Sequence, residues 1–282
     1  MTDSPHTAAK PEGVIVRHRP GPPPALGRLL LLPALGVPAG YYDPLAEQLT
    51  KAGLETHTLE LRGSGDSPLR AGRGCDFGFR ELLDEDIPSA LRPLHAAKDG
   101  LPVWLAGHSL GGHLAAMSAG RLGFAIDGLV LLACGLPWRG AFDARARLRI
   151  DVLRLLIPVC NTVLGYFPGD RLGFGGRQPR RLMREWSRLA YCGRYAAEGI
   201  DEDLEAGVAQ YAGPVLTLRM TDDPFAPLAA CRAVTEKMAH ARHSETALDA
   251  ATLGTRADHY RWARKPDAVT PHLTDWCRAQ RP

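Results

Sequence analysis

Residues 103–119 read VWLAGHSLGGHLAAMSA and carry the most informative pattern of the chain. The apolar run 103–106 is short enough for a strand that is buried on both faces, as parallel sheets require. Residues 110–122 are rich in Ala, Leu and Met, which favour a helix. A buried strand that leads through a tight glycine turn into a helix is typical of a parallel α/β sheet.

The same alternation of strands and helices extends in both directions from this segment. Further strands are predicted at residues 29–32, 54–59, 129–133, 215–219 and 244–248. Further helices are predicted at residues 41–52, 79–97, 227–239 and 260–278. The sequence therefore predicts an α/β fold with a mostly parallel central sheet that helices flank. At the start of the chain, residues 1–12 are expected to be a loose tail, and residues 14–17 form a short extended run.

The alternation stops at residues 137–208, where helical patterns are separated by glycine-rich turns. We interpret this segment as a helical cap inserted into the α/β core. The predicted organisation is then an N-terminal tail with a first strand (residues 1–27), a core (28–136 and 209–282) and the cap (137–208).

Composition excludes several classes of protein. The chain has 282 residues, of which 45% are hydrophobic, so it can form a substantial core and is not expected to be disordered. A net charge of +3 without a long basic run gives no indication of nucleic-acid binding. The six cysteines form no CxxC pair, which argues against a zinc site or a disulfide scaffold. Because no signal peptide or membrane span is recognisable, we expect a cytoplasmic location.

Gly107-His-Ser109-Leu-Gly111 fits the pattern G-x-S-x-G between a strand and a helix. In that setting the serine lies on a turn so tight that its hydroxyl projects from the edge of the sheet, and the glycines leave room for it. The backbone N–H of Leu110, at the start of the helix, would face the negative charge that develops on an attacked carbonyl oxygen.

With this motif the chain resembles the α/β-hydrolase superfamily over residues 28–280. Two further segments support the resemblance: Pro-Ala-Leu-Gly at 33–36 and Arg-Gly-Ser-Gly-Asp-Ser at 62–67. Residues 33–42 and the insert around Gly173 are also similar to a bacterial subgroup of serine hydrolases whose substrates are poorly defined. The resemblance implies that the backbone N–H of Leu35 is the second oxyanion donor.

A serine nucleophile needs a base that an acid orients, and in this superfamily the order along the chain is Ser, acid, His. Asp223 follows the strand at 215–219 and lies four residues before a proline, as the family pattern requires, and it is preferred to Asp222. His259 lies between the last predicted strand and the final helix and is preferred as the base to His243. His108 and His113, beside the motif, are expected to be structural.

We therefore expect a serine hydrolase that cleaves an ester or thioester with a Ser109, His259 and Asp223 triad and needs no metal or organic cofactor. An acyltransferase that uses the same acyl-enzyme is the main alternative, and a non-catalytic binding protein is a third possibility. The expected substrate is a small-molecule or carrier-bound acyl group. The sequence does not indicate the oligomeric state.

The cap carries an uneven charge. Between Arg139 and Arg194 there are twelve arginines, no lysine and four acidic residues, a net charge of +8 that leaves −5 for the rest of the chain. Apolar residues in the same segment suit an acyl pocket: Leu153, Leu156, Ile157, Val163, Leu164, Tyr166 and Phe167. The arginines could bind an acyl-carrier or coenzyme A thioester, attract an anionic membrane surface, or lie on solvated helix faces while the apolar residues pack the cap on the core.

Overall fold

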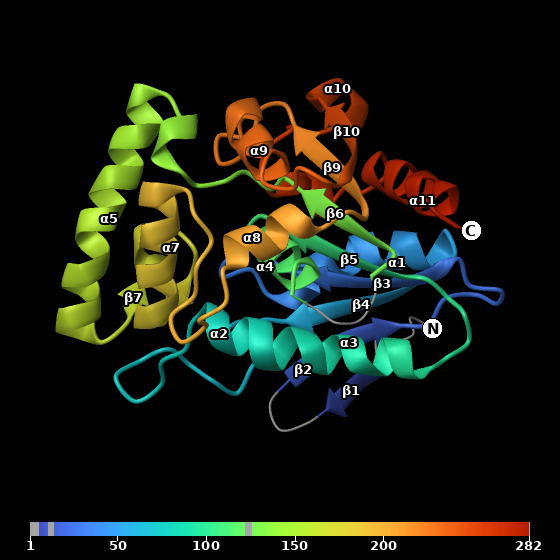
Figure 1. Ribbon diagram of the computed structural model, residues 1–282, viewed down its shortest axis with the longest axis horizontal. Coiled ribbons are helices and arrows are strands. Elements are labelled where there is room, and N and C mark those ends of the chain that lie inside the picture. The colour runs from blue at the N-terminus through green and yellow to red at the C-terminus, as the bar shows by residue number, and fades with distance from the viewer. Residues whose placement is uncertain (1–5, 11–13, 122–125, 282) are drawn as a thin grey trace.

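The computed structural model describes residues 6–10, 14–121 and 126–281 (Figure 1). Its main sheet has eight strands in the order β1-β2-β4-β3-β5-β6-β9-β10. The strands are β1 (His6–Lys10), β2 (Val14–Arg19), β3 (Gly27–Leu32), β4 (Leu54–Glu60), β5 (Val103–His108), β6 (Gly128–Leu132), β9 (Pro214–Met220) and β10 (Arg242–Leu248). From β4 to β10 all neighbouring strands are parallel, whereas β2 is antiparallel to both of its neighbours, β1 and β4.

This sheet confirms the predicted fold class. Every residue of β3, β5 and β6 is buried, because helices cover both faces of the central strands. The helices of the core are α1 (Asp43–Lys51), α2 (Phe79–Glu81), α3 (Ile87–Ala96), α4 (Leu110–Ala119), α8 (Leu204–Gln210), α9 (Leu228–Thr235), α10 (Ala250–Leu253) and α11 (Val269–Ala279). Side chains of α3 and α4 pack on one face of the sheet, and those of α1 and α11 pack on the other.

Several elements differ from the sequence-based expectation. Residues 6–10, expected within a loose tail, form β1 and pair with β2, while residues 1–5 and 11–13 lie outside the described part. The helix expected at 79–97 is α2, a π-helical turn η2 (Leu82–Asp86) and then α3. The final helix is divided into η4 (Arg261–Ala263) and α11, because Pro266 lies between them and cannot continue a helix.

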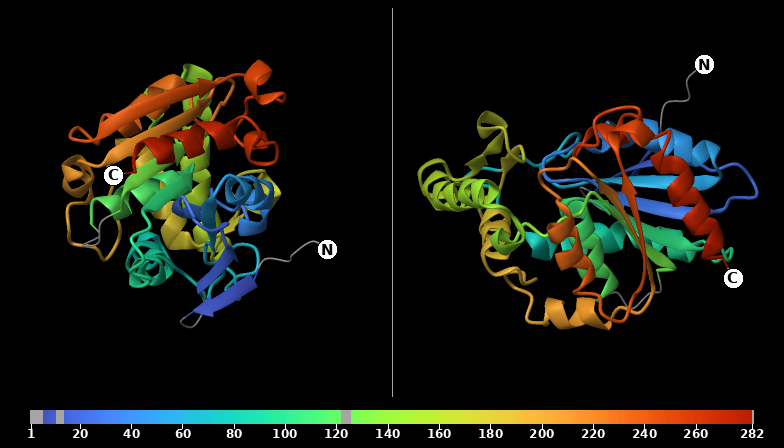
Figure 2. Two further views of the ribbon diagram at one scale, coloured as in Figure 1. Left: turned by 90° about the vertical axis from the view of Figure 1, so that its right-hand side faces the viewer. Right: turned by 90° about the horizontal axis from the view of Figure 1, so that it is seen from above.

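The insertion contains a short 3₁₀ turn η3 (Arg139–Ala141), the long helix α5 (Ala144–Leu164), α6 (Gly169–Leu172) and α7 (Arg180–Cys192). Two short strands, β7 (Phe167–Pro168) and β8 (Arg177–Gln178), form a hairpin within it. Helix α5 lies at the outer edge of the molecule, with α7 between it and the core (Figures 1 and 2). Most of helix α8 lies within the residues expected to form the cap. This helix contacts α4 of the core, at the point where Gly207 approaches Gly120. None of the described helices has both the length and the hydropathy that a membrane span needs.

Candidate active site

Ser109 occupies a strained turn between β5 and α4. Its backbone has φ 53° and ψ −116°, a conformation that L-residues rarely adopt. The turn is possible only with glycine on both sides: a Cβ on Gly107 would lie 2.2 Å from the backbone of Gly111, and one on Gly111 would lie 2.0 Å from the carbonyl oxygen of Leu32. This is the geometry of a nucleophile elbow, and the half-buried Ser109 lies at its apex.

Asp223 and His259 form a buried pair at the same edge of the sheet. The Nδ1 atom of His259 lies 2.6 Å from Oδ2 of Asp223, and both side chains are almost fully buried. The other carboxylate oxygen, Oδ1, accepts hydrogen bonds from the backbone N–H groups of Phe225 (2.8 Å) and Ala226 (3.2 Å). With Nδ1–H donating to the carboxylate, Nε2 of His259 keeps a lone pair and can accept a proton. Asp222 is exposed on the surface.

The ring of His108 connects this pair to the elbow. Its centroid lies 4.7 Å from that of His259, which places the imidazole of His259 beside the residue that precedes Ser109. Within the described part of the chain, the Ser109 hydroxyl forms no hydrogen bond. The structure thus brings Asp223 to His259, and it brings the ring of His259 to His108 of the elbow.

Tyr42 holds the loop after β3 against the elbow. Its hydroxyl accepts a hydrogen bond from the N–H of Ala34 (3.0 Å) and lies 2.7 Å from Nδ1 of His108. Burial raises the pKa of Tyr42, so the phenol is a donor to His108, and burial beside His259 holds the pKa of His108 well below its usual value. His108 is therefore a neutral structural histidine. The sequence analysis gave Tyr42 no role, although this residue ends the segment 33–42 that carries the subgroup resemblance.

The two residues that are expected to supply the oxyanion donors border one cavity. Leu35 and Leu110 line the same small cavity, which also borders Gln178 and Leu182 of the insertion. A Cβ on Gly36 would lie 2.1 Å from the carbonyl oxygen of Gly175, so the loop after β3 is in close contact with the insertion. Sequence reasoning placed no residue of the insertion here, because this contact joins segments far apart in the chain.

Glu60, at the end of β4, fastens two loops near the elbow. One oxygen of its buried carboxylate accepts the N–H of Ala39 at 3.0 Å, and the other accepts that of Asp66 at 3.3 Å. Burial raises the pKa of Glu60. The residue thus links the loop that follows β3 to the arginine-glycine loop that follows β4.

The other candidate histidines lie elsewhere. His113 is buried, and its ring nitrogens contact the hydroxyl of Tyr195 (2.8 Å) and the carbonyl oxygen of Gly135 (3.1 Å). Burial lowers the pKa of His113 to about 4. His243 pairs with Val215 near the amino ends of β10 and β9, and is therefore at the opposite end of the sheet from Ser109. Among these histidines, only His259 combines a position at the carboxyl edge with a carboxylate partner.

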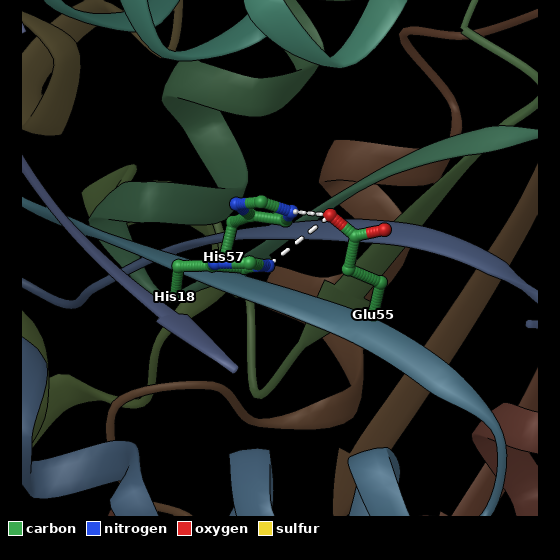
Figure 3. A group of neighbouring side chains, drawn as sticks. All are labelled: His18, Glu55 and His57. Carbon is green, nitrogen blue, oxygen red and sulfur yellow. Dashed lines mark hydrogen bonds and ion pairs between the residues drawn. The ribbon is translucent and has the colours of Figure 1, made fainter. Parts of the chain in front are cut away.

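A second cluster of polar side chains lies on β2 and β4 (Figure 3). The imidazoles of His18 and His57 stack with centroids 4.5 Å apart, and their Nε2 atoms lie 3.2 and 2.9 Å from Oε1 of Glu55. Two histidines and a carboxylate are a donor set that zinc accepts. However, Arg28 binds Glu55 as well, and two parallel rings cannot both direct a lone pair at one ion without turning. We therefore regard this cluster as a cross-strand ion-pair network.

The apolar residues expected to suit an acyl pocket or to pack the cap on the core differ in their burial. Ile157 and Phe167 are buried in the core cluster, whereas Leu156, Val163 and Leu164 are exposed. Apolar periodicity alone does not distinguish a face that lines a pocket from a face in solvent. A cavity of about 480 Å³ lies where α7 ends beside α8 and α9, and none of Ser109, Asp223 and His259 lines it.

Comparisons with solved structures support the fold. The monoglyceride lipase of Saccharomyces cerevisiae, solved as a soluble variant with a substrate analogue, has a TM-score of 0.72 and 15% identity, and the match covers 100% of this chain and 96% of that one. A monoacylglycerol lipase of Paleococcus ferrophilus has a TM-score of 0.64 at 18% identity, with 95% and 99% covered. The haloalkane dehalogenase DbeA of Bradyrhizobium elkani has a TM-score of 0.64 at 14% identity, with 98% of each chain covered.

No curated protein matches the chain significantly. Among protein-family models, residues 23–180 match the model described as serine aminopeptidase, S33. The matched region is more than half of the chain and includes the loop after β3, the elbow at Ser109 and most of the insertion. The chain therefore belongs to the serine aminopeptidase S33 family and is an enzyme of the α/β-hydrolase superfamily.

Proposed function

We propose that this enzyme hydrolyses carboxylic esters or thioesters through an acyl-serine intermediate on Ser109. The observation that carries the proposal is the buried Asp223 and His259 pair beside a strained serine turn. A serine hydroxyl becomes nucleophilic when an adjacent base removes its proton, and here His259 has the free ring nitrogen for that step.

In the first half of the reaction, Ser109 Oγ bonds to the substrate carbonyl carbon while its proton passes to Nε2 of His259. The N–H groups of Leu35 and Leu110 stabilise the negative charge on the carbonyl oxygen. The bond to the leaving alcohol or thiol then breaks, and the leaving group takes the proton from His259. In the second half, water gives a proton to His259 while its oxygen attacks the acyl carbon. The bond between that carbon and Ser109 Oγ then breaks, Oγ takes the proton back from His259, and the free acid leaves.

Labelling with a fluorophosphonate probe tests the nucleophile. We expect one adduct, which mass spectrometry of peptides assigns to Ser109, and none in Ser109→Ala. Absence of an adduct on the folded wild-type protein would contradict the proposal.

A substrate panel tests the reaction class. Activated esters and thioesters of several acyl lengths are compared with aminoacyl amides, and the acyl-enzyme is then challenged with amines, alcohols and thiols in water. We expect release of the free acid from esters or thioesters. Turnover of amides alone would assign a peptidase, as the name of the family suggests, and transfer to an added nucleophile in preference to water would assign an acyltransferase.

A further inference from the structure

Helix α5 presents an aliphatic face to solvent. Leu148, Val152, Leu155, Val159 and Val163 are 64, 47, 73, 58 and 62% exposed, although each is a large apolar side chain. Their spacing of three or four residues places them on one side of the helix, where they form a continuous ridge about 22 Å long. We call these five residues the α5 outer face.

The opposite side of α5 packs against the rest of the protein. Ile157 is 1% exposed, and Leu153 and Cys160 pack against the main core cluster beside α7. The helix is thus apolar on two sides, and only one is covered. The outer face therefore does not serve the folding of this chain. Exposed apolar surface of this extent on a monomer indicates an interaction site.

Positive charge borders the ridge. Arg145 and Arg149 are exposed, and each lies three residues before a member of the outer face, Leu148 and Val152 respectively. Neither arginine forms an ion pair within the described residues, whereas Arg139 and Arg154 both bind Asp151. The ridge thus has two cations available for an external anion.

The charge of the whole chain points the same way. The segment from Arg139 to Arg194 carries +8, and the remainder of the chain carries −5. A protein polarised in this way orients its positive end toward an anionic surface. The same charge opposes a dimer that would bring two such segments together.

We propose that the α5 outer face docks the enzyme on an anionic lipid membrane. The ridge consists only of exposed aliphatic side chains, and the helix that carries it lies at the outer edge of the molecule (Figures 1 and 2). Protein partners are usually anchored by Trp, Tyr or Arg in fitted pockets, whereas a bilayer accepts an aliphatic ridge bordered by arginine without a matching shape. This inference concerns binding and does not rest on the proposed ester hydrolysis.

Vesicle flotation tests the apolar contribution. Wild-type protein is mixed with vesicles of phosphatidylcholine alone or with 30 mol% phosphatidylglycerol. We expect it to float with the anionic vesicles, and expect Leu155→Asp with Val159→Asp to lower the partition coefficient at least tenfold. Leu69→Asp, at an exposed apolar residue outside α5, is the matched control and should bind as the wild type does.

The charge contribution has its own pair of variants. Arg145→Gln with Arg149→Gln should weaken binding to anionic vesicles by about fivefold per arginine and should reduce its dependence on salt. Arg92→Gln with Arg256→Gln removes two exposed arginines elsewhere and should have no effect.

Two results would overturn the proposal. One is that the wild-type protein does not float with anionic vesicles, or that Leu155→Asp with Val159→Asp floats as well as the wild type does. The other is a dimer, measured by light scattering, that the aspartates dissociate while no vesicle binding occurs, because the outer face would then be a contact between copies. If Leu155→Asp with Val159→Asp lowers the melting temperature, the variant Leu155→Gln with Val159→Gln is used in its place. Turnover of a water-dissolved ester should be the same in all these variants, which separates failure of docking from failure of the proposed function.

Discussion

The substitution Asp223→Asn tests the pair that Asp223 forms with His259. The same substitution at its exposed neighbour, Asp222→Asn, is the control. In Asp223→Asn, one oxygen remains to accept the N–H groups of Phe225 and Ala226, so the loop keeps its shape. The oxygen 2.6 Å from Nδ1 of His259 becomes an N–H donor if the amide keeps those two bonds. His259 must then place its lone pair on Nδ1 and carry the proton on Nε2, so that it can no longer act as the base proposed for Ser109.

The expected loss is large because no solvent can compensate. The side chain of Asp223 is 0% exposed, so water does not replace the lost acceptor. A wrong histidine tautomer in a serine triad lowers kcat by about 10⁴-fold, which corresponds to about 5.5 kcal/mol in the activation barrier. Asp222→Asn changes an exposed carboxylate and should retain activity within twofold to threefold.

The assay is steady-state hydrolysis of an activated ester, with the rate of fluorophosphonate labelling as a second measure of serine reactivity. We expect kcat and kcat/KM to fall together in Asp223→Asn, because the base acts in the transition state. Circular dichroism and a thermal melt establish that both variants are folded. The reasoning is refuted if Asp223→Asn keeps more than a tenth of wild-type activity, or if Asp222→Asn loses as much as Asp223→Asn does.

Two further predictions follow from the contacts around the site, and a third concerns Glu185 of α7, whose carboxylate accepts the backbone N–H groups of Phe79 and Glu198. Tyr42→Phe removes the acceptor of the Ala34 N–H and the donor to His108, and should lower stability by roughly 1–3 kcal/mol in a thermal or urea melt, with a lower kcat. Gly36→Ala places a Cβ against the insertion and should lower kcat/KM at least tenfold while the protein stays folded, as measured by ester hydrolysis and circular dichroism. Burial raises the pKa of Glu185 from 4.5 to about 7, so the folded protein holds a proton that the unfolded chain releases at lower pH. The resulting stability is fully present below pH 4.5 and is lost as the pH rises through about 7. Urea melts from pH 4.5 to 8 should show a loss of roughly 2–3 kcal/mol that Glu185→Gln abolishes and the exposed Glu236→Gln does not.

The sequence could predict those parts of the molecule that depend on local patterns. The strands at the centre of the sheet are continuous apolar runs, and the superfamily pattern places Ser109, Asp223 and His259 in loops at its carboxyl edge. For that reason the fold is confirmed and the structure brings Asp223 to His259. The catalytic roles of these residues remain predictions that labelling and mutation test.

The features that the sequence did not predict depend on contacts across the fold. Strand β1 has the sequence HTAAK, which lacks the apolar alternation of a typical strand, and it is defined by pairing with β2. Tyr42 lies on a 3₁₀ turn and acquires its role only where it meets His108. On α5, periodicity shows that the helix is apolar but not which of its two apolar sides is covered, so the sequence could not distinguish the buried Ile157 from the exposed Val163.

The insertion contributes to the geometry of the proposed catalytic site through its contact with the loop after β3. Ser109 and Asp223 follow the carboxyl ends of β5 and β9, and His259 follows α10 beyond the carboxyl end of β10. The loop that carries Leu35 is held differently: Tyr42 fixes Ala34 from the core, and Gly175 of the insertion touches Gly36 on the other side. Stabilisation of an oxyanion depends on a donor placed within a few tenths of an ångström. The position of the Leu35 N–H is therefore set jointly by core and insertion, and a change that shifts the hairpin of β7 and β8 should alter the rate of acyl transfer while leaving the Asp223 and His259 pair intact.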